Sequence, residues 1–182
     1  MRRGAPIGMV GLSGRTEFPH VHLSIRRHGK LLDPFTGNGI TVGCGKSGEP
    51  LWHPRSRPAY NPVALYAAVF SAGSVTRAEI HENAVAATRL PADAPALVLW
   101  VAMFGVRAGD SLLLRITGPD GAVLVDRQKP IGRTQAWRME YSGLRRRAAA
   151  WTPGRYRGLV KLRRRTPDGR LEKSRNVSVV VH

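Results

Sequence analysis

The sequence predicts a mainly-β protein whose C-terminal half is an antiparallel, immunoglobulin-like β-sandwich. Apolar runs of strand length recur along residues 95–182, and turn residues separate them. Pro-Asp-Gly turns at 118–121 and 166–169 each join two such runs, which is a specific signal for a hairpin. Several short strands at this spacing are typical of an antiparallel sandwich.

The expected strands of this sandwich follow one another closely along the chain. The first is an apolar, β-branched run, and the last two flank the second Pro-Asp-Gly turn. The start of the fifth, Pro153-Gly154-Arg155-Tyr156, resembles the strand starts of many accessory domains of this kind. The predicted strands are 96–104, 112–117, 122–127, 135–141, 155–164 and 170–181.

The residues before this domain divide into two further segments. In residues 1–37, apolar runs at 7–14 and 21–25 predict short strands with tight turns, and His28-Gly29-Lys30 predicts a turn. The composition of residues 38–94 predicts a Gly/Pro-rich connector with short elements. Within it, residues 63–70 fit one short helix or a buried strand, because periodicity does not separate the two over so short a run.

Composition limits the possible classes of protein. The 182 residues include 29 Lys and Arg against 12 Asp and Glu, a formal net charge of +17, which implies an anionic partner, or tolerance of one: nucleic acid, a membrane surface or an anionic wall polymer. The single cysteine, Cys44, excludes a disulfide framework or Cys-rich zinc finger within the chain. No apolar run approaches the ~18–20 residues of a membrane span, and no apolar core follows Arg2 and Arg3 as in a signal peptide.

The sharpest local motif is Pro19-His20-Val21-His22-Leu23. In a strand, residues i and i+2 share a face, so His20 and His22 would present two imidazoles side by side. One imidazole can ligate zinc, and the other can assist a metal-bound water or stabilise an oxyanion. On spacing alone, two half-exposed strand histidines without a ligand are the stronger interpretation.

The neighbouring residues extend this motif into an ordered pattern. Gly8-Met9-Val10-Gly11-Leu12-Ser13-Gly14 precedes it, and His28-Gly29 and then Asp33-Pro34 follow. Over about residues 4–36, this order resembles the C-terminal end of the lysostaphin/LytM-type zinc metallopeptidase domain. The resemblance implies that residues 1–37 are the tail of a LytM-type peptidase β-sheet, and that residues 95–182 are an accessory β-sandwich.

The resemblance also implies an activity, a cofactor and a partner. The family consists of zinc metalloendopeptidases that hydrolyse peptide bonds in bacterial cell-wall peptidoglycan. His22 aligns with a zinc ligand, and His20 aligns with the catalytic histidine that acts on the metal-bound water or the oxyanion. Zn²⁺ would supply Lewis acidity and a hydroxide-like nucleophile. The implied partner is peptidoglycan or another anionic wall polymer.

The chain also departs from the family's pattern. The family takes two further zinc ligands from a His-x-x-x-Asp motif and uses another catalytic histidine, all upstream of the matching strand. None of His28, His53, His81 and His182 has an Asp four residues on, so the chain alone is not expected to build a three-ligand site. Two explanations fit: the C-terminal part of a longer periplasmic or extracellular enzyme, or a short protein that kept the motif as a relic. Without a signal peptide, the chain alone would stay in the cytoplasm.

Residues 145–175 concentrate the positive charge. Twelve Lys and Arg stand there against Asp168 and Glu172, which leaves +10 of the chain's +17, and Trp151 and Tyr156 are interleaved as possible stacking residues. This pattern fits a solvated face, a surface for an anionic wall polymer or lipid, or a nucleic-acid surface. Nucleic acid is expected least, because no nucleic-acid motif accompanies the charge. The alternatives to an enzyme are therefore a catalytically inactive binding or regulatory β-module and a basic nucleic-acid-binding protein.

Overall fold

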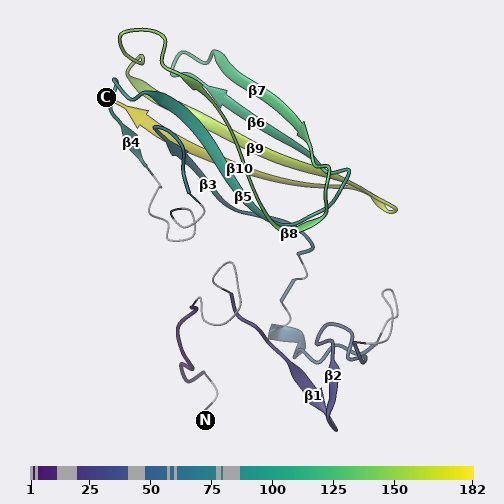
Figure 1. The fold of residues 1–182 in the computed structure, drawn as a ribbon. Helices are drawn as coiled ribbons and strands as arrows, with labels where there is room; N and C mark the ends of the chain where they lie inside the picture. Colours follow the sequence, from purple (N-terminus) through teal and green to yellow (C-terminus); the bar gives the residue numbers. More distant parts are fainter. Residues whose placement is uncertain are drawn as a thin grey trace. The chain divides into compact units, whose positions relative to one another are not determined.

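The structure, a computed structural model, is mainly β, as predicted. It describes residues 2, 4–11, 20–40, 48–56, 58–59, 61–76, 79 and 87–182. The chain divides into two compact units, Met1–Asn61 and Pro62–His182 (Figure 1). The boundary falls inside the segment 38–94, so this predicted connector contributes residues to both units.

The first unit contains a tight β-hairpin. Strands β1 (Ile25–Arg27) and β2 (Lys30–Leu32) pair antiparallel, and His28 (φ 49°) and Gly29 (φ 76°) form the turn between them. Two left-handed residues in a two-residue loop make a type I′ turn, whose twist matches that of the paired strands. The predicted turn is confirmed, and η1 (Pro54–Ser56) is a short 3₁₀ helix later in the unit.

The expectation of strands at 7–14 and 21–25 is wrong for most of the residues that the structure describes. Residues 7–11 and 20–24 lie outside any strand, β1 includes only Ile25 of the second run, and residues 12–19 are outside the described part. A strand needs a neighbour to pair its backbone N–H and C=O groups. The pairing of β1 with β2 begins at Ile25–Leu32, so the described hairpin offers residues 20–24 no such neighbour.

The chain turns sharply after β2. The Asp33 carboxylate accepts a hydrogen bond from the Phe35 N–H (2.8 Å), and the Asp33 carbonyl accepts one from the Gly37 N–H (2.8 Å). The Phe35 ring lies 5.9 Å from the Trp52 ring, centre to centre. These contacts fix the segment that follows the hairpin.

The second unit is a β-sandwich (Figure 1). Consecutive strands change sheet after β3, β4, β5, β7 and β8, whereas β6–β7 and β9–β10 are hairpins within one sheet, as in an immunoglobulin-like Greek key. Both hairpins use the predicted Pro-Asp-Gly turns. One sheet has the order β4 (Arg89–Leu90), β10 (Gly169–Val181), β9 (Gly154–Thr166), β6 (Ser111–Thr117), β7 (Val123–Pro130); the other has the order β3 (Ala64–Ser71), β5 (Ala96–Val106), β8 (Gln135–Arg145).

Two details differ from the expected antiparallel sandwich of residues 95–182. The short edge strand β4 pairs parallel with β10, so the five-stranded sheet is mixed. Strand β3 belongs to the sandwich although it lies in the predicted connector. It is a strand rather than a helix because it pairs antiparallel with β5, and a β-bulge between Leu65 and Ala67 lets Leu65, Ala68 and Phe70 all enter the core.

The core fills the space between the two sheets. Strand β6 alternates strictly, so Leu112, Leu114 and Ile116 are fully buried while their neighbours face outward. Tyr156, at the start of β9, is also buried, and its hydroxyl donates to the Thr152 carbonyl (2.9 Å). A tyrosine that bonds back to the chain just before its own strand is typical of immunoglobulin-like sandwiches.

Candidate functional sites

His20 and His22 lie in the segment that leads into β1. Both are exposed, and the His22 Nε2 atom lies 3.3 Å from the Ser24 hydroxyl oxygen. Because residues 20–24 are not a strand, the shared face expected from the i, i+2 spacing does not follow from the backbone here. The arrangement leaves the His22 ring accessible to a metal ion or to solvent.

The described residues do not complete a zinc centre around these histidines. Among them there is no group of three or more His, Cys, Asp and Glu side chains close enough to hold a metal. His28 is in the hairpin turn, and His53 accepts a hydrogen bond from the Arg55 N–H through Nδ1 (3.3 Å). His81 and Cys44 lie outside the described residues. The three-ligand site implied by the resemblance is therefore not assembled from this part of the chain.

An aromatic cluster that was not predicted from the sequence covers the outer face of the three-stranded sheet. Trp100 and Ala102 of β5 face outward, opposite Tyr141 and Met139 of β8 in the ladder. The signal was present in β5: its apolar run does not alternate, which indicates a strand covered on both faces.

A pocket of about 620 Å³ lies at one end of this face. We call it the Tyr141 pocket. Its lining residues are Ala72, Gly73, Ser74, Pro95, Ala96, Val98, Trp100, Tyr141, Gly143, Leu144 and Arg145. Trp100 is only 4% exposed and Tyr141 is 54% exposed, and their ring centres are 4.4 Å apart with a 33° tilt. Tyr141 therefore presents aromatic surface to solvent above a buried tryptophan.

Hydrogen bonds hold the buried tryptophan of the pocket in place. The Trp100 indole N–H donates to the Ser71 hydroxyl (2.9 Å), and that hydroxyl donates to the Gly73 carbonyl (2.7 Å). Ser71 is itself buried, so its hydroxyl is satisfied within the protein rather than by solvent. Groups of the protein itself therefore satisfy the hydrogen bonds at the base of the pocket.

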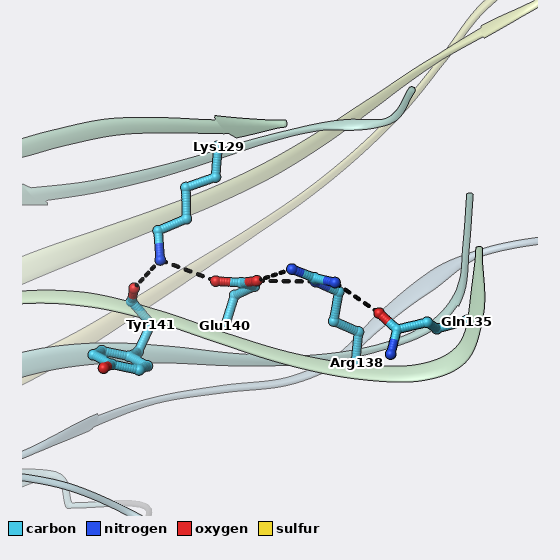
Figure 2. A network of polar contacts seen from close by, with 5 residues as sticks. All are labelled: Lys129, Gln135, Arg138, Glu140 and Tyr141. Atoms are coloured by element: carbon cyan, nitrogen blue, oxygen red, sulfur yellow. Dashed lines mark hydrogen bonds and ion pairs between the residues drawn. The ribbon is translucent and has the colours of Figure 1, made fainter. Parts of the chain in front are cut away.

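A polar network on the neighbouring strand edges holds Tyr141 (Figure 2). The Lys129 ammonium donates to the Tyr141 carbonyl (2.8 Å) and to the Glu140 carboxylate (2.9 Å), and it lies 5.3 Å from the Tyr141 ring centre. Arg138 also donates to Glu140, and it donates to the Gln135 side chain (2.6 Å). Burial raises the pKa of Glu140, but the hydrogen bonds from Lys129 and Arg138 and their charges outweigh burial and lower it.

An arginine-lined groove of about 850 Å³ adjoins the pocket and shares Gly143, Leu144 and Arg145 with it. The other lining residues are Leu124, Arg146, Arg147, Ala148, Ala150 and Trp151. Arg146 donates to the carbonyls of Ala148 (2.8 Å) and Ala149 (2.6 Å). Arg145 and Arg147 are exposed, and neither pairs with a carboxylate among the residues that the structure describes.

A second basic surface covers the outer face of the five-stranded sheet. Cations outnumber carboxylates there, and the ladder places on this face Arg89, Arg115, Arg155, Arg157, Lys161, Arg163, Arg165 and Arg170, with Asp126 and Glu172. Glu172 pairs with Lys161 (3.0 Å) and Arg163 (2.9 Å), whose hydrogen bonds lower its pKa. Arg157 and Arg165 have no carboxylate partner within the described ranges.

The structure corrects two expectations for the basic segment 145–175. Tyr156, a predicted stacking candidate, is 2% exposed and belongs to the core. Arg164, counted with the surface charges, is buried and pairs with Asp110. Both follow from the alternation along β9, which turns every second side chain inward.

Comparison with known proteins yields no match, either to a family model or to a curated protein. In the described part of the chain, no helix has the length and apolar character needed to cross a membrane. A functional assignment therefore depends on the residues and surfaces described above.

Proposed function

We propose that this chain is part of a LytM-type zinc metalloendopeptidase that hydrolyses peptide bonds of cell-wall peptidoglycan. In this proposal His22 is a zinc ligand and His20 is the catalytic histidine. The supporting observation is the order of elements after the His-x-His motif. The β1–β2 hairpin follows the motif directly, and the turn at Asp33 follows the hairpin. This is the order that the resemblance to the family requires.

The proposal requires a His and an Asp ligand from a motif that the sequence does not contain. The sequence has no His-x-x-x-Asp motif, and the described residues form no three-ligand group. The missing His and Asp then come from residues outside this sequence. The substrate places the complete enzyme in the periplasm or outside the cell.

The test is the zinc content of the native protein isolated from its source cells, together with its intact mass. We expect a mass above that of the 182 residues and about one zinc per chain. His22→Ala should remove the zinc, whereas His28→Asn, which changes a histidine of the same hairpin, should retain it. Asn suits the control because it tolerates the left-handed backbone of position 28. Unchanged zinc in His22→Ala, or a zinc-free native protein, would refute the assignment.

A second candidate is a binding module without catalysis that attaches to an anionic wall polymer. The basic outer face of the five-stranded sheet favours it, because Arg157 and Arg165 have no carboxylate partner within the described ranges. We expect the 182-residue protein to sediment with purified cell walls at low salt, and to sediment several-fold less when Arg157 and Arg165 are both changed to Glu. A matched variant, Arg26→Glu with Arg27→Glu on β1, should sediment like the wild type. Equal sedimentation of all three proteins, or tight salt-dependent binding to duplex DNA instead, would refute this candidate.

A further inference from the structure

We propose that the Tyr141 pocket binds a sugar ring that carries a carboxylate, with the ring stacked on Tyr141 and the carboxylate paired with Arg145. The proposal rests on the proposed function for the source of the sugar, which is a glycan strand of the cell wall from which the peptide has been removed, because the peptide otherwise holds the carboxyl group of N-acetylmuramic acid in an amide bond. Its chemistry depends only on the pocket.

The size and lining of the pocket suit a sugar. Its volume of about 620 Å³ lies within the usual range of ligand sites, roughly 300–1,000 Å³. A pyranose ring has an apolar face of C–H groups that can lie flat on an aromatic ring. The exposed side of Tyr141 offers such a surface, and Ala72, Ala96 and Val98 supply further apolar contact.

Hydrogen bonds within the protein hold both aromatic residues of the pocket. Trp100 is fixed by Ser71, and the backbone at Tyr141 is fixed by Lys129 (Figure 2). Because these groups are already satisfied and packed, little conformational entropy remains to be lost on binding. A weakly interacting ligand such as a neutral sugar ring benefits most from this preorganisation.

Arg145 indicates the charge of the ligand. Among the described residues that line the pocket it is the charged one, and it has no carboxylate partner of its own. A guanidinium binds a carboxylate through two parallel hydrogen bonds, which fixes orientation as well as charge.

A nucleic acid fits the same surface less well. A single strand of nucleic acid carries one phosphate for each base. Proteins that bind it therefore place a row of cations along its backbone, beside the aromatic residues on which the bases stack. Here one arginine serves the pocket, and the guanidinium of Arg146 in the groove is already bonded to backbone carbonyls. The arrangement matches one anionic group beside one ring.

The test is a titration of the 182-residue protein, followed by tryptophan fluorescence and calorimetry. The probe is the wall disaccharide of N-acetylglucosamine and N-acetylmuramic acid, and the comparison is the disaccharide of two N-acetylglucosamines, which lacks the carboxylate. We expect the acidic disaccharide to bind about tenfold more tightly, as a charge-assisted hydrogen bond allows. Arg145→Gln should abolish this preference without weakening the binding of the neutral sugar.

Substitutions of the aromatic ring test the stacking. Tyr141→Ala should lower the affinity for both disaccharides by about tenfold or more. Tyr141→Phe keeps the ring, so its affinities should stay within about threefold of those of the wild type. Phe104→Ala, an exposed aromatic residue outside the pocket, and Arg165→Gln, on the other sheet, are the controls and should leave both affinities unchanged.

Three outcomes would overturn the sugar site: equal affinity for the two disaccharides, binding indifferent to Tyr141→Ala, or tighter binding of an oligothymidylate than of either sugar. None of these measurements involves zinc or His22. Failure of the sugar site would therefore be distinct from failure of the peptidase proposal, which the zinc content decides.

Discussion

Arg164 and Asp110 form a two-pronged ion pair inside the sandwich. The arginine Nε atom lies 2.8 Å from Asp110 Oδ1, and one terminal nitrogen lies 2.7 Å from Oδ2. The same terminal nitrogen donates to the Gly105 carbonyl (2.7 Å), and Oδ2 accepts the Arg107 N–H (2.8 Å). The hydrogen bond from Arg164 to Asp110 raises the pKa of the guanidinium further above its ordinary value, so the pair stays charged. It ties β9 to the turn between β5 and β6, where the chain crosses from one sheet to the other.

Asp110→Asn should destabilise the protein by about 3–5 kcal/mol, because it leaves the Arg164 charge buried without its counter-charge. The side chains of Arg164 and Asp110 are only 6% and 1% exposed, so solvent cannot replace the lost partner. The measurement is the midpoint of urea unfolding.

The matched control for this pair is Asp126→Asn. Asp126 pairs with Arg115 at 2.8 Å, but both side chains are at least 40% exposed, so the loss should be below about 1 kcal/mol. If the two variants unfold at the same urea concentration, the buried pair does not stabilise the sandwich.

Tyr156→Phe tests the hydrogen bond that the Tyr156 hydroxyl donates to the chain just before β9. The phenyl ring can fill the same core space, so the change removes only the hydrogen bond to the Thr152 carbonyl. We expect a loss of about 1 kcal/mol in the free energy of unfolding. Tyr141→Phe, at a tyrosine that is 54% exposed, should leave the stability unchanged; a similar loss in both would show that the hydrogen bond of Tyr156 contributes nothing of its own.

The strands of the sandwich could be predicted from the sequence because their signals are local. Alternation and Pro-Asp-Gly turns are read within a few residues, and the observed bounds of β6 and β9 differ from the predicted ones by one or two residues. The parallel pairing of β4 with β10 could not be predicted in this way, because it joins residues far apart in the chain.

The functional surfaces depend on the same long-range pairing. Tyr141 meets Trp100 only through the register of β8 on β5. Arg164 is one of three consecutive arginines, and only its register position on β9 brings it to Asp110 instead of to solvent. The histidines illustrate the converse: their motif was recognisable locally, but a metal site needs ligands that the local sequence does not contain.

Glu140 should make the stability of the fold decrease at acidic pH. Its pKa in the folded protein is lowered, so its carboxylate stabilises the fold fully above the ordinary pKa of Glu, about 4.3. This contribution declines as the pH falls through that value and is gone below the lowered folded pKa. We expect Glu140→Gln to be about 1–3 kcal/mol less stable than the wild type at pH 7.

The measurement for Glu140 is urea unfolding of both proteins from pH 7 to pH 3. Comparing the two proteins at each pH cancels the other carboxylates, which also titrate in this range. The difference should shrink with acidification; a difference that stays constant would mean that the Lys129 and Arg138 bonds do not favour the charged form.

Alanine substitutions at Gly105 and Gly109 distinguish two costs of adding a side chain to a left-handed residue: backbone strain and a clash of the new Cβ atom with its neighbours. Both have positive φ, 68° and 89°, so Ala strains the backbone at either position by about 1–2 kcal/mol. At Gly109 a Cβ atom meets nothing within 4 Å, whereas at Gly105 it would lie 2.2 Å from the Pro62 carbonyl oxygen. Gly105→Ala must also displace the backbone just before β3, or the Gly105 carbonyl that accepts from Arg164. We therefore expect Gly105→Ala to lower the urea midpoint well beyond Gly109→Ala, and equal midpoints would show that this close approach does not constrain the sandwich.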